Sequence, residues 1–518
     1  MKKTKENGVT LIALVVTIII LLILASISIS MLTGDNGILK QASRAKTDTA
    51  IAQKEEEKNL EELENIMYEN TTSIEVEQTE DKFPGVLEKE NEDTFVINSI
   101  EDLVFFAYDV RNGNSYEGKN VKLGISLDFK SSKSYVEADR EDYLNYGYNG
   151  NLKQCLTNGA GFISIGETTR DSNGKANYFA GNFDGDNKII NNLYMDVNNE
   201  SNSKNCYLAL FGYRIDGKIE NLKLTNVDIT LRDKQNSSAC TGLVCCAVNE
   251  GVEISNCSVS GKISHYSSGK GDVNCSGIIA YNNSGMISNC SNFANIHGEI
   301  QGENTEASCY VGGVAVNQSN EMKNCFNAGN LTAIGKKGNL QLGGVSRILS
   351  VDNSNTKNCF NKGTINVIGN QSTVNIGGIT SLTMARTKIE NAYNVGKIVF
   401  DCTDSQIKLG GLVGYHGGDI ENSYNIGKVE CTNLNNCNSV SIGELIGWAW
   451  WKFAGNTIVN TYYSKNNGYE AIGANDSNST DYTEVATEDF INGNLVNKLN
   501  KTEHTWKQGK SYPILDWE

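Results

Sequence analysis

Acidic side chains are the first candidates for chemistry in this chain of 518 residues. Asp184 and Asp186 stand in the sequence F-D-G-D, and Glu421 directly precedes a recurrent Asn. Two carboxylates about 5 to 9.5 Å apart can hydrolyse a glycosidic bond, and a polysaccharide lyase needs a base, commonly with Ca²⁺ held by carboxylates. F-D-G-D lacks the spaced ligands of an EF-hand loop. We therefore expect it to form a turn between strands.

The position before the recurrent Asn holds many residue types. Glu occupies it in three copies, Ser or Lys in four and an apolar residue in one. The occupants are Glu220, Glu390, Glu421, Ser255, Ser288, Lys323, Lys357 and Val459. Such a varied, mostly polar position is typical of a strand residue that faces solvent. We therefore predict no catalytic residue here, and a carbohydrate-active enzyme (polysaccharide lyase or glycosidase) is the alternative to a protein without catalytic activity.

The histidines form no recognisable site. His265, His297, His416 and His504 are too few and too scattered for the ligand spacing of a zinc site. His416 lies in a Gly-rich stretch, where we expect a surface turn. No Ser/His/Asp, Cys/His or phosphate-binding glycine motif stands out. We therefore expect no metal, no cofactor and no enzymatic activity.

Fourteen cysteines occur, and four of them share one slot of a repeat. The four are Cys257, Cys290, Cys325 and Cys359. Later copies hold Ala392, Ser423 and Thr461 in that slot. A slot that accepts Ala, Ser and Thr indicates a small buried side chain, which favours free thiols. Neighbouring turns can bring such thiols within bonding range, so disulfides remain open.

An internal repeat organises most of the chain. Asn followed by a small residue recurs at intervals of 31 to 38 residues. The seven clear copies begin at Asn256, Asn289, Asn324, Asn358, Asn391, Asn422 and Asn460. A second Asn often follows three residues later, and a Gly with aliphatic residues lies 12 to 15 residues upstream. Self-similarity at such a period indicates a repeat architecture.

The repeat predicts a mainly β fold, a right-handed parallel β-helix over residues 87–464. Each copy contains aliphatic runs of three to six residues bounded by Gly and Asn, for example Gly396–Phe400, and such runs are typical of strands. Helical repeats would need two periodic apolar segments per copy. Parallel strands about 4.8 Å apart would stack equivalent residues of successive coils. We therefore predict a structural ladder of buried Asn amides, with Gly at corners that need unusual backbone angles.

One copy carries a family resemblance. The sequence G-G-L-V-G-Y-H-G-G-D-I-E-N-S-Y-N-I-G-K-V at Gly410–Val429 resembles the GLUG repeat of bacterial surface proteins, and weaker likeness extends over residues 205–465. Upstream, Phe179–Tyr194 looks like the first coils of such β-helices. The resemblance implies exposure at the cell surface, often in adhesin-like proteins. It does not imply catalysis.

The N-terminus predicts export. Lys2, Lys3 and Lys5 precede Gly8, and no charge occurs from Asn7 through Gly34. A helix over residues 9–34 is long enough to cross a hydrocarbon core of about 30 Å. The basic flank predicts a cytoplasmic N-terminus and a single-pass membrane protein with the β-helix outside the cell. A secretory signal that releases the chain, and an uncleaved anchor, remain as alternatives.

The first 35 residues also resemble a type IV prepilin. Residues 1–8 match the leader of that family, Gly8 matches the residue before the cut, and Val9 matches the first residue of the mature helix. The resemblance implies a prepilin peptidase and a pilus or secretion assembly as partners. Ala13 stands where the family usually has a Glu that neutralises a neighbour's α-amine. This departure favours a minor pilin-like component over a major pilin.

The remaining segments complete the predicted organisation. Residues 35–70 are rich in Ala, Lys, Glu and Leu and predict an exposed helical stalk. Residues 71–86 form an acidic linker, and residues 465–518 a C-terminal cap. Ile97–Ala107 predicts a short capping helix before the first coils, because solenoids need atypical ends to cover their core.

Charge and aromatic residues indicate the kind of partner. The net charge of −16 argues against nucleic acid. Variable segments between strands would emerge along one edge of a rigid scaffold, where recognition usually lies. Tyr266, Tyr310 and Trp448 can stack on sugars of a glycan or host-surface ligand, although we expect the cluster Trp448–Trp451 to lie under the C-terminal cap. The prediction is a membrane-anchored, cell-surface adhesive, display or minor pilin-like protein.

Overall fold

The computed structural model describes most of the chain beyond residue 86. The described residues are 87–129, 161–170, 175–199, 205–234, 238–247, 249–302, 307–350, 353–450, 457–464, 467–474, 480–500 and 504–518. Contacts divide the chain into two units, residues 1–80 and 81–518, and every described residue belongs to the second. The predicted leader, membrane helix, stalk and linker, with Gly8 and Val9, lie outside the described residues. Within the described ranges, no helix is long and apolar enough to cross a membrane.

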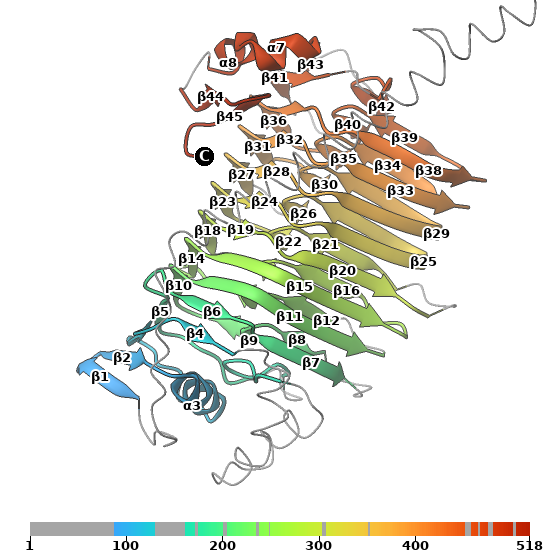
Figure 1. The fold of residues 1–518 in the computed structure, drawn as a ribbon. Helices are drawn as coiled ribbons and strands as arrows, with labels where there is room; N and C mark the ends of the chain where they lie inside the picture. The colour runs from blue at the N-terminus through green and yellow to red at the C-terminus, as the bar shows by residue number, and fades with distance from the viewer. Residues whose placement is uncertain are drawn as a thin grey trace, which may run out of the picture. The chain divides into compact units, whose positions relative to one another are not determined.

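The second unit is a parallel β-solenoid (Figure 1). Its strands form a 34-stranded sheet that follows several faces of the coil and a nine-stranded sheet on another face. Each strand pairs in parallel with the equivalent strand of the next coil, as in β25–β29 and β30–β35. The predicted mainly β, parallel β-helix is therefore confirmed, and its right-handed sense stays a prediction.

Short strands that precede the recurrent Asn form the first face of the coil. Equivalent strands pair in parallel along the stack. They are β3 (Asn120–Leu123), β5 (Asn182–Asp184), β10 (Lys218–Glu220), β14 (Glu253–Ser255), β18 (Met286–Ser288), β23 (Glu321–Lys323), β27 (Asn355–Lys357), β31 (Lys388–Glu390), β36 (Asp419–Glu421) and β41 (Ile458–Tyr463). After the Asn, a second set of short strands follows. These are β4 (Leu127–Asp128), β6 (Ile189–Asn191), β19 (Ser291–Asn292), β24 (Phe326–Asn327), β28 (Phe360–Asn361), β32 (Tyr393–Asn394) and β37 (Tyr424–Asn425).

Each coil then extends into an outgoing arm and a returning arm. The outgoing arms are formed by β7 (Tyr194–Asn199), β11 (Lys223–Asp233), β15 (Ser258–Ser267), β20 (Asn295–Ile300), β25 (Leu331–Gly343), β29 (Ile365–Gly377), β33 (Ile398–Thr403) and β38 (Val429–Asn435). The returning arms are formed by β8 (Tyr207–Leu208), β12 (Ser238–Thr241), β16 (Val273–Ser276), β21 (Cys309–Gly312), the second halves of β25 and β29, β34 (Gln406–Gly410) and β39 (Val440–Gly443). In β25 the chain turns at Lys337 and Gly338, both with positive φ. The two arms face each other, because a Cβ on Gly335 would lie 2.7 Å from a methyl of Leu340.

The nine-stranded sheet, here called sheet B, closes each coil. Its strands are β9 (Phe211–Ile215), β13 (Val244–Ala247), β17 (Ile279–Asn282), β22 (Ala315–Gln318), β26 (Ser346–Leu349), β30 (Thr380–Thr383), β35 (Val413–His416), β40 (Ile446–Ala449) and β42 (Ile472–Ala474). The core between the faces is mainly aliphatic, with several phenylalanines in the first coils, and is continuous from the first coils to the last. In β35, for example, Val413 is fully buried in this core while Tyr415 lies on the outer face.

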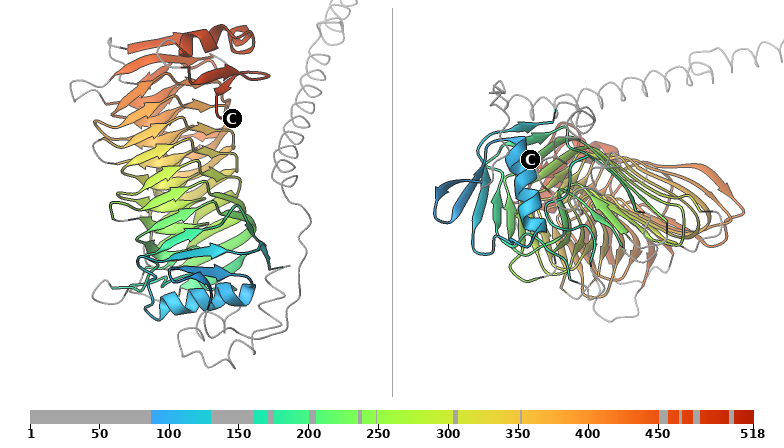
Figure 2. Two further views of the ribbon diagram at one scale, coloured as in Figure 1. Left: turned by 90° about the vertical axis from the view of Figure 1, so that its left-hand side faces the viewer. Right: turned by 90° about the horizontal axis from the view of Figure 1, so that it is seen from below.

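Both ends of the stack are covered. The strands β1 (Glu88–Asn91) and β2 (Thr94–Ile97) precede α3 (Ile100–Arg111), which lies across the N-terminal end in Figure 2. Ser99 caps α3 by accepting a hydrogen bond from the Asp102 amide, and Phe106 packs on Phe179 and Phe183 of the first coils. Beyond β43 (Thr480–Glu484), the C-terminal end carries α7 (Thr487–Ile491), α8 (Asn494–Leu499), β44 (Trp506–Gln508) and β45 (Pro513–Leu515).

The recurrent Asn residues occupy the corners between the two short strands. All seven, together with the weaker copy Asn221, have φ between +49° and +55°, a left-handed conformation that Asn tolerates better than most residues. The unusual backbone angles expected at the repeat's Gly column therefore occur mainly at the Asn column, and in the Gly column only Gly261 has a positive φ among the described copies. The Gly column serves close approach instead, since a Cβ on Gly363 would lie 2.0 Å from the Gly329 carbonyl oxygen.

The same Asn side chains hydrogen-bond from coil to coil. Each Nδ2 donates to the Oδ1 of the preceding coil's Asn at 3.0 Å, in an unbroken series from Asn256 to Asn391, and Asn460 donates to Asn422. The expectation that all these amides are buried was wrong. Asn256 and Asn289 are exposed and Asn324 is half-buried, whereas Asn358, Asn391, Asn422 and Asn460 are buried.

A second Asn ladder lies inside the coil. It consists of Asn292, Asn327, Asn361, Asn394 and Asn425, all fully buried. Each Nδ2 donates to the Oδ1 of the next coil's Asn at 2.7 to 2.9 Å. Most of the Oδ1 atoms also accept a backbone N–H two residues on, as Asn394 does from Gly396. The ladder thus satisfies amides whose burial without partners would be costly.

Candidate ligand-binding strip

The F-D-G-D carboxylates form a turn, as expected. Asp184 Oδ1 accepts the Asp186 backbone N–H at 2.8 Å and the Asn221 side-chain amide at 3.0 Å. Asp186 forms an exposed ion pair with Lys188. Both carboxylates therefore stabilise the local backbone and the first step of the Asn ladder.

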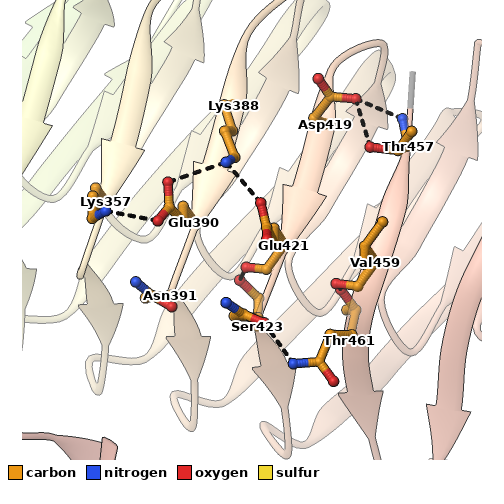
Figure 3. Close-up of polar contacts among 12 residues, drawn as sticks. Lys357, Lys388, Glu390, Asn391, Asp419, Glu421, Ser423, Thr457, Val459 and Thr461 are labelled. Carbon is orange, nitrogen blue, oxygen red and sulfur yellow. Dashed lines mark hydrogen bonds and ion pairs between the residues drawn. The ribbon is translucent and has the colours of Figure 1, made fainter. Parts of the chain in front are cut away.

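Apart from the buried Ser255, the column before the recurrent Asn is exposed or half-buried. It carries an ion-pair chain (Figure 3). Lys357 Nζ lies 2.7 Å from Glu390, and Lys388 Nζ lies 3.2 Å from Glu390 and 2.7 Å from Glu421. Burial acts to raise the pKa of Glu390, but its hydrogen bonds with Lys357 and Lys388 outweigh burial and lower that pKa. A glycosidase general acid needs a raised pKa, so Glu390 is poorly suited to that role.

The histidines occupy structural positions. His416 was expected on the surface, but it is buried with Nδ1 3.0 Å from Thr383 Oγ1, and burial lowers its pKa to about 3. The Gly-rich sequence around it reflects close packing of backbones and not an exposed turn. His265 is also buried between two arms, and burial lowers its pKa to about 4. His297 contacts Glu299 at 2.9 Å.

The repeated cysteine slot lies in the core. Cys257, Cys290, Cys325 and Cys359 are buried unbonded thiols, as are the other buried cysteines of the described ranges. The amide N–H of Cys290 donates to the Cys325 sulfur at 3.4 Å, and that of Cys325 to the Cys359 sulfur at 3.4 Å. In the described ranges, no group of three or more His, Cys, Asp or Glu residues is arranged to hold a metal ion.

The three predicted stacking residues do not lie together. Tyr266 is on β15, where its ring is 5.3 Å from the His297 ring and 5.9 Å from the Arg232 guanidinium. Tyr310 is on the returning arm β21, and Trp448 is on β40 of sheet B. Trp448 stacks on Tyr415 and pairs in register with Ala474 of β42, which belongs to the predicted cap range 465–518. That the cluster Trp448–Trp451 lies under the cap stays a prediction, because Trp451 lies outside the described residues.

Returning arms and sheet B bring two rows of side chains together. On the arms, residues in register are Tyr207, Ala239, Asn274, Tyr310, Gln341, Asn375, Lys408 and Ser441. On sheet B, the residues in register are Arg214, Cys246, Tyr281, Asn317, Ile348, Leu382, Tyr415 and Trp448. The row on sheet B crosses eight strands, which at the usual strand spacing is about 34 Å.

The C-terminal end of these rows is aromatic and basic. Tyr415 and Trp448 stack with ring centroids 4.7 Å apart at an interplanar angle of 27°. Lys408 Nζ crosses from the arm to lie 4.7 Å from the Tyr415 ring and 5.5 Å from the Trp448 ring. Burial lowers the pKa of Lys408. The three side chains are half-buried, so they hold a defined surface that remains open to solvent.

Two further cation–ring contacts follow the same rows toward the N-terminus. Arg347 lies 3.9 Å from the Tyr310 ring centre and donates to Asn317 Oδ1 at 3.1 Å. Arg170 lies 5.0 Å from the Tyr213 ring and donates to the Tyr207 hydroxyl at 3.0 Å. We call the whole set the aromatic–basic strip. It comprises Arg170, Tyr207, Tyr213, Tyr281, Tyr310, Arg347, Lys408, Tyr415 and Trp448.

The strip can stack flat ligands and hydrogen-bond them. Aromatic faces bind apolar ring surfaces, and cations held over aromatic rings keep donors available to acceptors on a ligand. Between Tyr310 and Lys408, the buried oxygens Gln341 Oε1 and Asn375 Oδ1 have no hydrogen-bond partner within the described part of the chain. Both atoms are shielded from solvent, so the donors and rings of the strip, and not these oxygens, face a ligand.

Sequence reasoning found two members of the strip and missed the rest. Tyr281, Tyr415 and Trp448 share one repeat slot, at the end of I-I-A-Y, L-V-G-Y and L-I-G-W. Aligning the aliphatic strand of each copy would have placed these aromatics in one row. Arg347 and Lys408 gave no such signal, because each occurs once and its ring partner comes from a different strand.

Comparison with known proteins adds one family match. The model of the GLUG motif matches residues 407–430, which contain the predicted Gly410–Val429 copy and the strip residues Lys408 and Tyr415. The predicted GLUG resemblance is thus confirmed for this copy, and the match identifies a repeat motif without assigning an enzymatic activity. No curated protein matches the chain.

One solved structure aligns with most of this chain at low similarity. It is described as a "putative immunoglobulin A1 protease" from Bacteroides ovatus, with 14% sequence identity and a TM-score of 0.40 over 82% of this chain and 93% of that chain. Similarity at this level says nothing about activity.

Proposed function

We propose that this chain is a non-catalytic glycan-binding protein of the cell surface, in an adhesive or display role. The observation that supports the proposal is the aromatic–basic strip, which runs along the stack and presents rings and cations together. Side chains held by a stack of paired strands lose little conformational freedom on binding, which favours recognition. The best-placed carboxylates, Glu390 and Glu421, are engaged by lysines instead.

Binding by the full-length chain to a panel of immobilised polysaccharides tests this proposal. We expect Tyr415→Ala and Trp448→Ala each to weaken binding about tenfold, because each variant loses an aromatic face that buries apolar surface of a sugar ring. Tyr266→Ala is the matched control, since its ring lies apart from the strip on β15. Equal losses in all three variants, or no polysaccharide bound, would contradict the proposal.

The same samples address the enzymatic alternative. A polysaccharide lyase or glycosidase would release unsaturated or reducing ends from a bound polymer, and substitution of one carboxylate would stop that release. We expect no product from any polymer that the chain binds. Turnover that Glu421→Gln abolishes would replace the proposed function by the alternative.

Placement at the cell surface rests on the sequence alone. The basic and apolar N-terminus supports a single-pass anchor in the cytoplasmic membrane, and the match of Gly8 and Val9 to prepilins supports processing by a prepilin peptidase and assembly as a minor pilin-like component. Fractionation and N-terminal sequencing of the mature protein test this. A chain that begins at Val9 supports the prepilin route, one that begins at Met1 an uncleaved anchor, and one that begins after Ser28 a secreted protein.

A further inference from the structure

Three cations of the strip form no direct ion pair with a carboxylate within the described part of the chain. They are Arg170, Arg347 and Lys408, and each lies over an aromatic ring instead. Several other basic side chains of the strands pair with acids, as Lys357 does with Glu390 and Lys388 with Glu421. Acidic residues outnumber basic ones by 61 to 45 in this chain. The strip thus carries positive charge against the overall charge of the chain.

The geometry of these cations leaves donors unused. Arg347 is half-buried, and of its five donors one terminal N–H bonds Asn317. The guanidinium also interacts with Tyr310 and with the charge of the Asp272 carboxylate. Lys408 has three donors, and its described contacts are the faces of Tyr415 and Trp448. A ring face attracts a cation but does not replace a charged acceptor. A ligand anion would complete both sites.

The spacing of the cations fits a polymer. Arg347 is on β26 and Lys408 is on β34, two coils further along the stack, or about 10 Å at the usual strand spacing. On the arm row, the buried Gln341 and Asn375 precede Lys408 in register. Two positive charges thus lie about two coils apart along the strip. This spacing suits a chain of sugars in which acidic groups recur.

We propose that the strip selects an acidic polysaccharide, with carboxylate or sulfate groups bound by Arg347 and Lys408. This inference rests on the proposed function, because it names the class of glycan that the strip takes. Stacking on Tyr310, Tyr415 and Trp448 would orient the sugar rings. Arg347 and Lys408 would bind the acidic substituents and so select a polymer that carries them. A negatively charged protein would repel an acidic polymer over most of its surface, so binding concentrates at the strip.

The experiment compares four polymers on the full-length chain. Polygalacturonate carries carboxylates, its carboxyl-reduced form is the neutral match, dextran sulfate carries sulfates, and polyglutamate is an acidic polymer without sugars. We expect the chain to bind polygalacturonate or dextran sulfate, and the preferred one identifies the anion. Affinity should fall at least about tenfold on carboxyl reduction and with salt raised from 0.05 to 0.5 M, because charge-assisted contacts are lost or screened.

Variants of Lys408 test whether its positive charge is needed for binding when the fold is intact. Lys408→Gln should weaken binding of the acidic polymer about tenfold, and Lys408→Arg should retain most of it, because the charge remains. Lys262→Gln is the control, since it removes an exposed charge from β15. Circular dichroism of each variant checks that the solenoid is intact.

The outcomes distinguish the two proposals. Equal binding of the carboxyl-reduced and acidic forms, still lost in Trp448→Ala, would overturn the choice of an acidic ligand and leave glycan binding in place. Polyglutamate bound as tightly as polygalacturonate would also overturn it, because charge alone would then explain binding. If none of the three sugar polymers and no neutral polysaccharide binds, the proposed function fails as well.

Discussion

At the scale of single residues, Asn does two tasks at each corner of the coil. Its backbone adopts a left-handed conformation, and its side chain links successive coils. Asn391 shows both, with φ of +51° and an Nδ2 that donates to Asn358 at 3.0 Å while the residue is 1% exposed. The sequence predicted the stacking of this column from its period. It did not predict the backbone angle, because a repeated Asn is equally compatible with a strand interior or a turn.

Substitutions of Asn391 separate these tasks. Asn391→Ala should lower the free energy of unfolding by about 2–4 kcal/mol. Ala is strained in the left-handed backbone conformation, and its side chain leaves the Asn358 amide oxygen without its donor. Asn391→Gly should cost less, since glycine accepts the backbone angle. Urea denaturation measures the order. The exposed Asn256→Gly is the control, and a larger loss for Asn391→Gly than for Asn391→Ala would contradict the account.

The buried histidines predict an acid-sensitive fold. Burial lowers the pKa from 6.5 to about 4 for His265 and to about 3 for His416. Below pH 6.5 the unfolded chain binds protons that the folded chain does not, so stability is complete above that pH and falls as pH decreases toward 4. Each histidine contributes a slope of up to about 1.4 kcal/mol per pH unit.

Denaturant midpoints measured from pH 7.5 to 4 check this slope. His416→Asn should flatten the profile between pH 6.5 and 4, whereas the exposed His504→Asn should leave it unchanged. A wild-type stability that stays constant through this window would show that the histidines are not buried as neutral groups.

At the scale of elements, the C-terminal segment covers one column of aromatic rings. Phe326, Phe360, Tyr393 and Tyr424 stack in order with ring centroids 4.7 to 5.1 Å apart. Residues of α7, α8, β44 and β45 form a shared apolar cluster with these rings. In earlier coils the same slot holds Ser258 and Ser291, so the aromatic column begins only in the coils that carry these rings.

Glu518 holds the C-terminal segment in place through hydrogen bonds and an ion pair. The Glu518 carboxylate accepts the Tyr393 hydroxyl at 2.8 Å, the Lys362 ammonium at 2.8 Å and the Leu515 amide at 2.8 Å. Glu518→Ala should lower the free energy of unfolding by about 2–3 kcal/mol, because these donors lose a charged acceptor. The exposed Glu484→Ala is the control, expected within about 0.5 kcal/mol of wild type. Equal thermal melts for Glu518→Ala and wild type would contradict this role.

Elements differ in how far the sequence predicts them. The strands before and after the recurrent Asn follow from aliphatic runs and their period, and the capping helix predicted at Ile97–Ala107 lies close to α3 at Ile100–Arg111. A cap was predicted at the C-terminus, but not its docking on Tyr393 and Tyr424. That contact joins residues about 90 to 125 positions apart in the chain. Local sequence patterns do not predict which distant residues come into contact.

At the scale of the whole molecule, the repeat explains both the fold and the strip. Parallel pairing places equivalent slots side by side, so a slot that holds an aromatic in several coils becomes a row. Tyr281, Tyr415 and Trp448 lie in one row for this reason. The cations do not follow the repeat, since Arg347 and Lys408 reach their rings from other strands. The stacking surface was therefore within reach of the sequence, and its charge was not.

Hydroxyl-radical footprinting of the full-length chain, with and without the bound polysaccharide, tests the central claim most directly. Tyr and Trp side chains report their own exposure, and the strip and the rest of the surface both contain them. The account predicts that the glycan protects Tyr310, Tyr415 and Trp448 while Tyr266 on β15 and Trp517 near the C-terminus stay as reactive as in the free protein. Protection of Tyr266 or Trp517 without protection of Tyr415 and Trp448 would contradict it.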